Sequence, residues 1–447
     1  MVPLVLGASN ADAQVLYGSV VGNVTDNTGA ALPGSTVTVT NKETGAVRET
    51  VTDETGAYRV PTLQPGSYRI VVGLTGFTSA SRPDVPVTLN TVTRVNMSLQ
   101  VGEMSETITV EASSPLLQTD RAEVRSELNT RELRDLPVPI GRNYQNLFKV
   151  LPGFTPPADA HSVPSNPSRA LTFNVNGASR SSNNTRIDGV STTNIWLPHV
   201  VAYVPALESL ETVNVVTNSF DAEQGLAGGA AINVQIKSGT NNIRGSAFEY
   251  HTNEKLRALN YFAPKGTPKG EWRYNQFGGT VGGPVVRNKL FYFASYEGTR
   301  DKQNVSRTLS VPTAALRQGN FSAASNPIYD PMTGDMDGNG RTPFPGNIIP
   351  QNRIDPISLR LLQELPLPNL TDPDGSIPEQ NNYFVQAPFI FNRWTLDSKV
   401  NFNATDKLHV FGRYSVLDFK QDNATVFGDF LQGPPVGGGN PGIGSGK

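Results

Sequence analysis

The sequence predicts a mainly β protein: a small N-terminal β-sandwich, an α+β domain, and the first strands of an antiparallel transmembrane β-barrel. Three observations predict this class. The 447 residues include 42 glycines and 34 prolines but no long helix-favouring stretch. Turn signals separate short alternating segments in the first hundred residues. Towards the C-terminal end, segments of about ten residues alternate between apolar and polar side chains, a length that crosses a bilayer as a strand.

Charge and cysteine content narrow the possible functions. The formal net charge is −2, so bulk electrostatics favour no nucleic-acid partner. The chain has no cysteine, which excludes disulfides and thiolate metal sites. No run of about 20 apolar residues encodes a transmembrane helix, because the nearest candidate, 200–207, is short and contains Pro205.

The first 14 residues have the pattern of a processed leader. Residues 2–6 are apolar, and Ala11-Asp12-Ala13 matches an A-x-A cleavage site. The first basic residue is Lys42, so a basic start is missing. We interpret residues 1–14 as a signal-peptide remnant, and a chance apolar terminus is the alternative.

Residues 15–100 predict the β-sandwich. Strands are expected at 20–26, 36–40, 49–52, 58–60 and 68–72, with turns between them. The spacing of Gly22, Asp26, Gly56, Tyr58 and the Pro65-Gly66 pair resembles the carboxypeptidase regulatory-like domain, which is also described as a carbohydrate-binding-like fold. The resemblance implies a fold and no peptidase activity. A spacer or docking role is favoured over sugar binding.

The linker 101–114 contains a short alternating segment that suits strand addition, in which an extended peptide pairs with the sheet edge of another protein. This segment resembles a TonB box, which implies an energy-coupling protein of the TonB type as partner. The alternative is the last strand of the preceding sandwich. The residues are Glu106, Thr107, Ile108, Thr109 and Val110.

Residues 115–243 predict a compact α+β unit. A helix is expected within 116–136, and strands at 172–175, 185–190, 211–216 and 231–237. The order of motifs resembles the plug of TonB-dependent receptors, and Gly141-Arg142-Asn143 with residues 220–223 resembles the Oar-like branch. The plug motif residues are Asn176, Gly177, Arg180, Asp188, Gly189, Lys237, Ser238 and Gly239. We expect Asp188-Gly189 to form a turn, and the glycine-rich stretch 225–229 to pack against the barrel wall.

From residue 244 onward, about five barrel strands are expected. In the segment 393–402, Trp394, Leu396 and Val400 share one face, whereas Asp397 and Lys399 lie on the other. A lysine facing lipid at the midplane costs roughly 2 to 4 kcal/mol, so the apolar face must point outward. A soluble β-sandwich, whose strands also alternate, is the alternative from strand pattern alone.

The connections between these strands alternate in length. Residues 252–271 and 299–391 are long, whereas 283–289 and 403–407 are short. Outer-membrane barrels have short periplasmic turns and long extracellular loops. This places 299–391 outside the cell and the N-terminal domain in the periplasm.

Metal chemistry has weak support. His251 and Glu254 copy a zinc spacing, with His409 as a distant third ligand, but surface polar residues are the favoured interpretation. Asp335, Asp337 and Asn339 match the first half of a calcium loop that lacks its bidentate glutamate, and a plain turn is favoured. The glycine-rich C-terminal end, 442–447, lacks the features of a phosphate loop. We expect no cofactor and no catalytic residue.

The resemblance implies TonB-dependent transport of a ligand across the outer membrane, with lipid around the barrel and no enzymatic step. The alternative is a barrel that acts as a surface adhesin or in protein export or anchoring. Carbohydrate, peptide and siderophore all remain open as the ligand. A barrel that encloses a plug needs about 22 strands, so we expect 244–447 to be an incomplete barrel and the chain to be a fragment.

Overall fold

The computed structural model describes most of the chain, and the segment 1–14 lies outside the described part. None of the described helices is long and apolar enough to cross a membrane. The described residues are 17–102, 107–109, 122–159, 161, 166–220, 224–225, 227–259, 261, 269–405 and 408–437.

The N-terminal domain is the expected β-sandwich. Its buried side chains alternate along the strands, and its apolar core is drawn from residues 20–99 alone. The strands follow the order β3-β2-β5-β6-β8-β1-β4, and β7 pairs with β1 in parallel. Their bounds are β1 (Gly18–Asp26), β2 (Thr36–Asn41), β3 (Val47–Val51), β4 (Ala57–Leu63), β5 (Gly66–Gly73), β6 (Phe77–Val87), β7 (Val92–Arg94) and β8 (Met97–Val101).

Two turns of the sandwich repeat the same sequence pattern and the same hydrogen bonds. Asp26 and Asp53 each begin a D-x-T-G-A segment. The Oδ1 atom of Asp26 accepts the backbone N–H of Thr28 and Ala30 and the hydroxyl of Thr28. In the second turn, the Oδ1 atom of Asp53 accepts the equivalent three bonds from Thr55 and Ala57. The side-chain bond is the main cause that lowers the pKa of each carboxyl, with the backbone bonds adding to it.

The sandwich should therefore lose stability in acid. A carboxyl whose pKa is lowered by folding stabilises the native state above its unfolded pKa of about 4, and this contribution is lost as the pH falls through the folded value. Because residues 17–102 hold their own core, this fragment can be tested by thermal unfolding between pH 7 and pH 3. The double variant Asp26→Asn, Asp53→Asn should show a flatter pH dependence. The variant Glu54→Gln is the control, and an equal acid sensitivity in the double variant contradicts the assignment.

The second domain is a five-stranded mixed sheet with short helices. The sheet order is β10-β15-β16-β13-β14, and a small pair of strands, β11 and β12, lies beside it. The strands are β10 (Val124–Leu128), β11 (Ala158–Asp159), β12 (Leu171–Thr172), β13 (Asn184–Ile187), β14 (Val190–Ser191), β15 (Leu210–Asn218) and β16 (Ala231–Ile236). The longer helical segments are α1 (Thr130–Asp135) and the 3₁₀ helix η1 (Tyr144–Val150).

The prediction of a helix within 116–136 is wrong over much of this range. Residues Val124–Leu128 form β10, which pairs antiparallel with β15, and only Thr130–Asp135 is helical among the described residues of this range. The helix begins where Asn129 and Glu132 form a reciprocal capping box. Pairing with a buried neighbouring strand overrides the helical spacing of the leucines.

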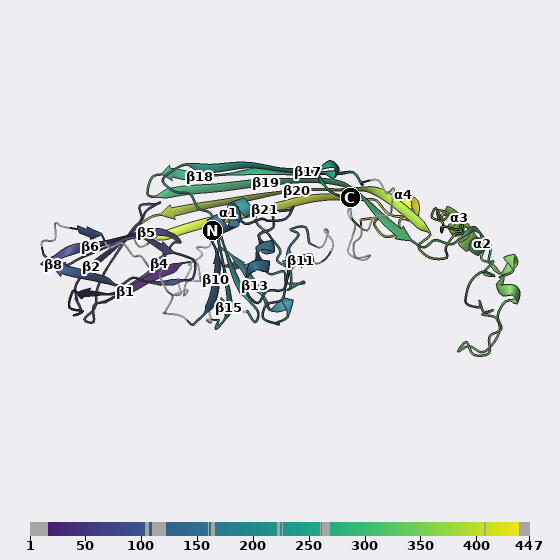
Figure 1. The fold of residues 1–447 in the computed structure, drawn as a ribbon, viewed down its shortest axis with the longest axis horizontal. Helices are drawn as coiled ribbons and strands as arrows, with labels where there is room; N and C mark the ends of the chain where they lie inside the picture. Colours follow the sequence, from purple (N-terminus) through teal and green to yellow (C-terminus); the bar gives the residue numbers. More distant parts are fainter. Residues whose placement is uncertain are drawn as a thin grey trace, which may run out of the picture.

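The third part is a five-stranded antiparallel sheet, in the order β17-β18-β19-β20-β21. Figure 1 shows it as one broad curved layer, with the sandwich below one end and the second domain below its middle. Its strands are β17 (Arg244–Asn253), β18 (Trp272–Val286), β19 (Leu290–Leu309), β20 (Tyr383–Asn403) and β21 (His409–Asn423).

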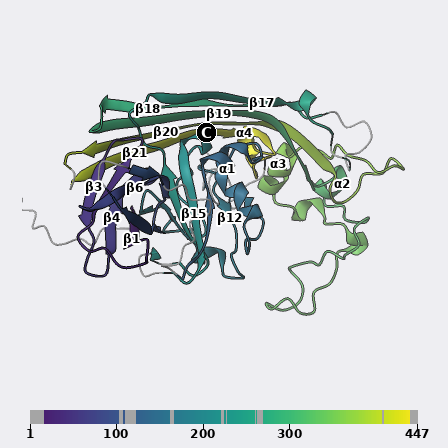
Figure 2. The same cartoon turned by 60° about the vertical axis from the view of Figure 1, so that its left-hand side comes forward.

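The strands are longer than the sequence analysis expected. Residues 299–309 and 383–391, which we assigned to the long loop, continue β19 and β20 and pair with each other. The loop therefore spans 310–382, and Figure 2 shows it at the end of the sheet away from the sandwich. It contains α2 (Ala314–Arg317), η6 (Pro345–Asn347), η7 (Gln351–Arg353) and α3 (Pro356–Glu364).

The described glycines of the stretch 225–229 have near neighbours in the second domain. A Cβ atom built on Gly229 would lie 2.6 Å from Oδ1 of Asn183, and one on Gly228 would lie 3.4 Å from Cβ of Ser182. Both neighbours belong to the second domain itself. These glycines allow close packing within that domain, and packing of the stretch against the wall stays a prediction.

Candidate functional site

The polar face of β20 is covered by the second domain, as the face assignment predicted. Thr395, Asp397, Lys399, Asn401 and Asn403 are all buried. Val400 and Phe402, on the opposite face, are 47% and 43% exposed. The polar face therefore points inward to a protein neighbour, and the apolar face is free to meet lipid.

Asp188 is the centre of the contact between the second domain and the sheet. It follows β13, and both Asp188 (φ +45°) and Gly189 (φ +83°) adopt left-handed conformations, as expected for a tight turn between β13 and β14. Its carboxylate accepts a bond from Lys399 Nζ at 3.0 Å and lies 3.5 Å from Arg413 Nε. The side chains of Asp188 and Lys399 are 4% and 7% exposed. The turn thus inserts one buried negative charge between two cations of the wall.

Residues that follow β16 form the second part of this contact. Lys237 Nζ donates to the carbonyl of Glu208 within the second domain. Ser238 Oγ accepts a 3.3 Å bond from Asn401 Nδ2. A Cβ atom on Gly239 would lie 2.3 Å from the carbonyl oxygen of Tyr292 on β19. Glycine is required here because two backbones touch.

A further set of buried charges joins β19 and β20 to the second domain. Arg393 pairs with Glu297 at 3.0 Å, and its other terminal nitrogen donates to the carbonyl of Ser168. The guanidinium of Arg169 lies 3.7 Å from Asp301 and 4.4 Å from the ring centre of Phe391. These residues were not singled out from the sequence. Glu297 and Asp301, four residues apart on the strand, share the face that carries charge, which is the signal that could have found them.

Two cavities lie along the contact. The smaller, about 260 Å³, is bordered by Arg142, Arg169 and Arg393 together with Glu297. Arg142 belongs to the Gly-Arg-Asn motif; it pairs with Glu208 at 2.7 Å and lies over the ring of Tyr250 on β17. This motif therefore links the second domain to the first strand of the sheet.

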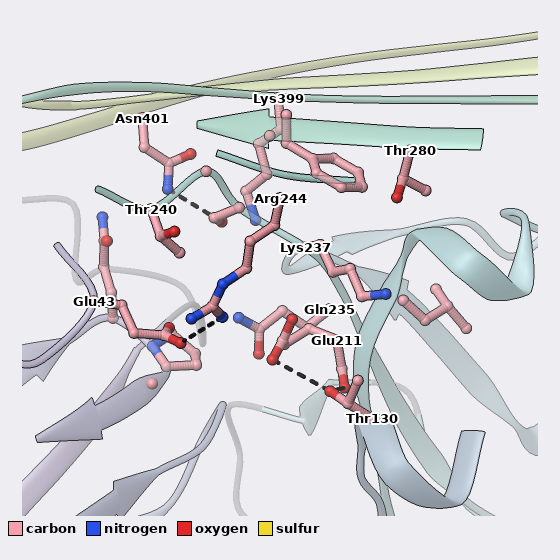
Figure 3. A pocket seen from close by; sticks show the side chains of 18 of the residues that line it. Glu43, Thr130, Glu211, Gln235, Lys237, Thr240, Arg244, Thr280, Lys399 and Asn401 are labelled. Carbon is pink, nitrogen blue, oxygen red and sulfur yellow. Dashed lines mark hydrogen bonds and ion pairs between the residues drawn. The ribbon is translucent and has the colours of Figure 1, made fainter. Parts of the chain in front are cut away.

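The larger cavity, about 380 Å³, lies where the sandwich, the second domain and the sheet meet. Figure 3 shows Glu43 of the sandwich reaching Arg244 of β17, at 3.5 Å. On the other side, Thr130 donates to Glu211, whose pKa is raised by burial and lowered in part by Lys237. Acidic and basic side chains both line the cavity, so its described lining favours neither an anion nor a cation.

Comparisons with known proteins agree with this arrangement. Residues 235–444 match the family model described as outer membrane beta barrel domain, and residues 19–100 match the carboxypeptidase regulatory-like domain. The TonB-dependent transporter Oar of Myxococcus xanthus is 26% identical over 287 residues. The chain is a homologue of this TonB-dependent transporter. The match covers 62% of the chain and 26% of the relative, so the chain spans about a quarter of that relative's length.

Solved structures resemble this chain only in part. The outer membrane transporter YddB from Escherichia coli is 13% identical, with a TM-score of 0.39, over 67% of this chain and 34% of that chain. The group B streptococcus pilus 2b backbone protein is 18% identical, with a TM-score of 0.16, over 19% of this chain and 41% of that chain. Similarity at these TM-scores carries no functional argument.

Not all the plug motif residues of this chain contact the wall, which is the sheet of β17 to β21. Asn176 and Gly177 form a tight turn with positive φ angles of 49° and 78°, closed by the N–H of Ala178 on the carbonyl of Val175. Arg180 is exposed in the short 3₁₀ helix η2 (Arg180–Ser182). The structure thus brings together Asp188, Ser238 and Gly239 at the wall, and leaves Asn176, Gly177 and Arg180 outside this contact.

The TonB-box-like segment lies at the edge of the sandwich. Thr107–Thr109 form β9, which pairs in parallel with residues 79–81 of β6. Glu106 and Val110 lie outside the described residues. The pairing comprises three residues, and this is the strand geometry that we weighed as the alternative to a coupling role.

The calcium-loop candidate forms a turn. Asp335 Oδ1 accepts the backbone N–H of Asn339, and Gly338 has φ +89°. No group of three or more His, Cys, Asp or Glu side chains gathers as a metal site within the described residues. His251 and His409 bond instead to the amide side chains of Asn275 and Asn403.

Proposed function

We propose that this chain forms the plug-bearing part of an energy-coupled outer-membrane transporter. One observation carries the proposal: the plug contacts the wall mainly through polar groups. The described apolar core of the plug consists of buried residues from 128–236. The sheet contributes one described buried residue to this core, Phe293 of β19. The other described wall contacts include the ion pairs and hydrogen bonds around Asp188, Arg393 and Ser238. A polar contact can be rehydrated when it opens, so the plug can shift without the exposure of a large apolar core.

The proposed orientation in the membrane rests on the connections of the sheet. The ends at which β18 is joined to β19 and β20 to β21 lie near the sandwich, whereas the loop 310–382 lies at the other end. Short turns face the periplasm and long loops the exterior in outer-membrane barrels. The sandwich is therefore assigned to the periplasm. A ligand, which we take to be a carbohydrate, peptide or siderophore, enters from the side of the loop.

The coupling step is assigned to residues 106–110. A TonB-type protein would pair with the backbone of this segment by strand addition. Because β9 forms three pairs with β6 among the residues that the structure describes, a longer pairing with a partner strand can replace it. The sandwich and the partner would then compete for the same edge of the segment.

The variant Ile108→Pro should lose binding to the partner, because proline removes the backbone donor that a strand pair needs. Binding of the purified periplasmic domain of the organism's TonB-type protein is measured by biolayer interferometry. We expect a loss of at least tenfold in affinity. Ile108→Ala keeps the backbone donor and serves as the control. Equal binding by the proline variant and the parent protein would remove the coupling role from this segment.

A further inference from the structure

Two of the four histidines in the sequence face each other. His161 and His199 lie 38 residues apart in sequence, and their Nε2 atoms are 2.6 Å apart. The ring centres are separated by 4.9 Å, with an angle of 41° between the planes. The other two histidines are held by asparagine side chains on barrel strands. The pair therefore differs from the rest in having imidazole nitrogens that converge on one point.

His199 is carried by a loop of the plug that hydrogen bonds define, whereas His161 lies close to the end of β11. His199 lies in a small closed loop, in which Asn194 donates to the carbonyl of Val200 and Thr193 forms a bridge to Val201. His161 follows β11, which pairs with β12. Its φ angle of +70° is unusual for a residue other than glycine. Such conformations concentrate at functional sites, because the surrounding structure must hold them.

The chemistry of this pair suits a transition metal. A neutral imidazole binds late first-row divalent ions through Nε2 at about 2.0 to 2.1 Å. Two such bonds at angles of roughly 90 to 110° require nitrogens about 2.9 to 3.3 Å apart. The observed spacing of 2.6 Å is shorter by less than 1 Å, so the two nitrogens need to separate only slightly to hold an ion. His161 is exposed, which leaves the point of convergence open to solvent.

We propose that His161 and His199 form a two-imidazole site for a late first-row divalent metal ion, with Cu²⁺ binding most tightly. Within the described residues no third His, Cys, Asp or Glu completes a cage. Water or donor atoms of another molecule can fill the remaining coordination positions. This inference is independent of the proposed transport, because it concerns binding of the ion alone.

The site is tested with the full chain, purified without a polyhistidine tag. Isothermal titration calorimetry measures the binding of Cu²⁺ and of Zn²⁺. We expect one ion per chain. Binding should weaken at least tenfold in His161→Asn, which tolerates the positive φ, and in His199→Gln. The variants His251→Ala and His409→Ala are controls that should bind as the parent protein does. Mg²⁺, which prefers oxygen ligands, should not compete.

Electron paramagnetic resonance of the Cu²⁺-loaded parent protein gives a second readout that needs no variant. Coupling to two imidazole nitrogens supports the site. Coupling to one or none overturns it, as does equal Cu²⁺ affinity in all four variants or the absence of a stoichiometric ion.

Discussion

The variant Asp188→Asn should destabilise the plug on its wall by about 3 to 5 kcal/mol, which is typical when a buried ion pair loses one partner. The amide retains the size of the side chain, tolerates the positive φ and can still accept the N–H of Ile236. What it removes is the negative charge between Lys399 and Arg413. The buried ammonium of Lys399 is then left beside a neutral group. Pulse proteolysis in urea on the detergent-solubilised chain measures the change in free energy.

A double variant separates charge from shape. In Asp188→Asn, Lys399→Met the buried cation is also removed, so we expect much of the lost stability to return. The control Asp335→Asn makes the same chemical change in the exposed loop and should have little effect. If Asp188→Asn alone is as stable as the parent protein, the ion pairs do not hold the plug.

Gly239→Val should force the plug away from the wall and cost about 3 kcal/mol or more. A Cβ atom at Gly239 would lie within 3 Å of three backbone atoms, namely the carbonyl oxygens of Tyr292 and Gly283 and the nitrogen of Tyr292. Backbone in a paired sheet cannot rotate away as a side chain can. We expect limited proteolysis to cleave the plug at lower protease concentration than in the parent protein.

The matched control is Gly412→Val on β21. A Cβ atom there meets no atom within 4 Å, and valine favours a strand. This variant should be as resistant to protease as the parent protein. Equal sensitivity of the two variants would show that valine harms the strands in general and that close approach at Gly239 is not the cause.

Periodicity and motif order predicted much of the fold. The alternation from Trp394 to Asn403 correctly assigned the outward and inward faces, because lysine and aspartate are too costly in lipid. The Asp188-Gly189 turn was also predicted, since these residue types accept positive φ. The sandwich strands followed from turn residues, and the structure confirms them.

Other features depended on contacts distant in sequence. Val124–Leu128 became a strand because β15 lies beside it, and no local pattern encodes that neighbour. The extension of β19 to Leu309 required twenty paired residues on β20, which polar residues such as Arg300 and Asn304 concealed. The partners of Asp188 lie more than 200 residues away, so the motif identified the residue but not its charge pairs.

The position of β10 determines how the plug would respond to mechanical load. Among the described strands it lies at the edge of the plug sheet and pairs with β15. Arg125 also ties it to the sandwich, through the carbonyls of Leu89 and Asn90. Tension applied to the chain before Val124 therefore reaches β10 first. This strand can be stripped from β15 while β13 and β16, which carry the anchoring residues, stay in place. The plug is built to yield from one edge, and a modest pull need not extract the whole domain.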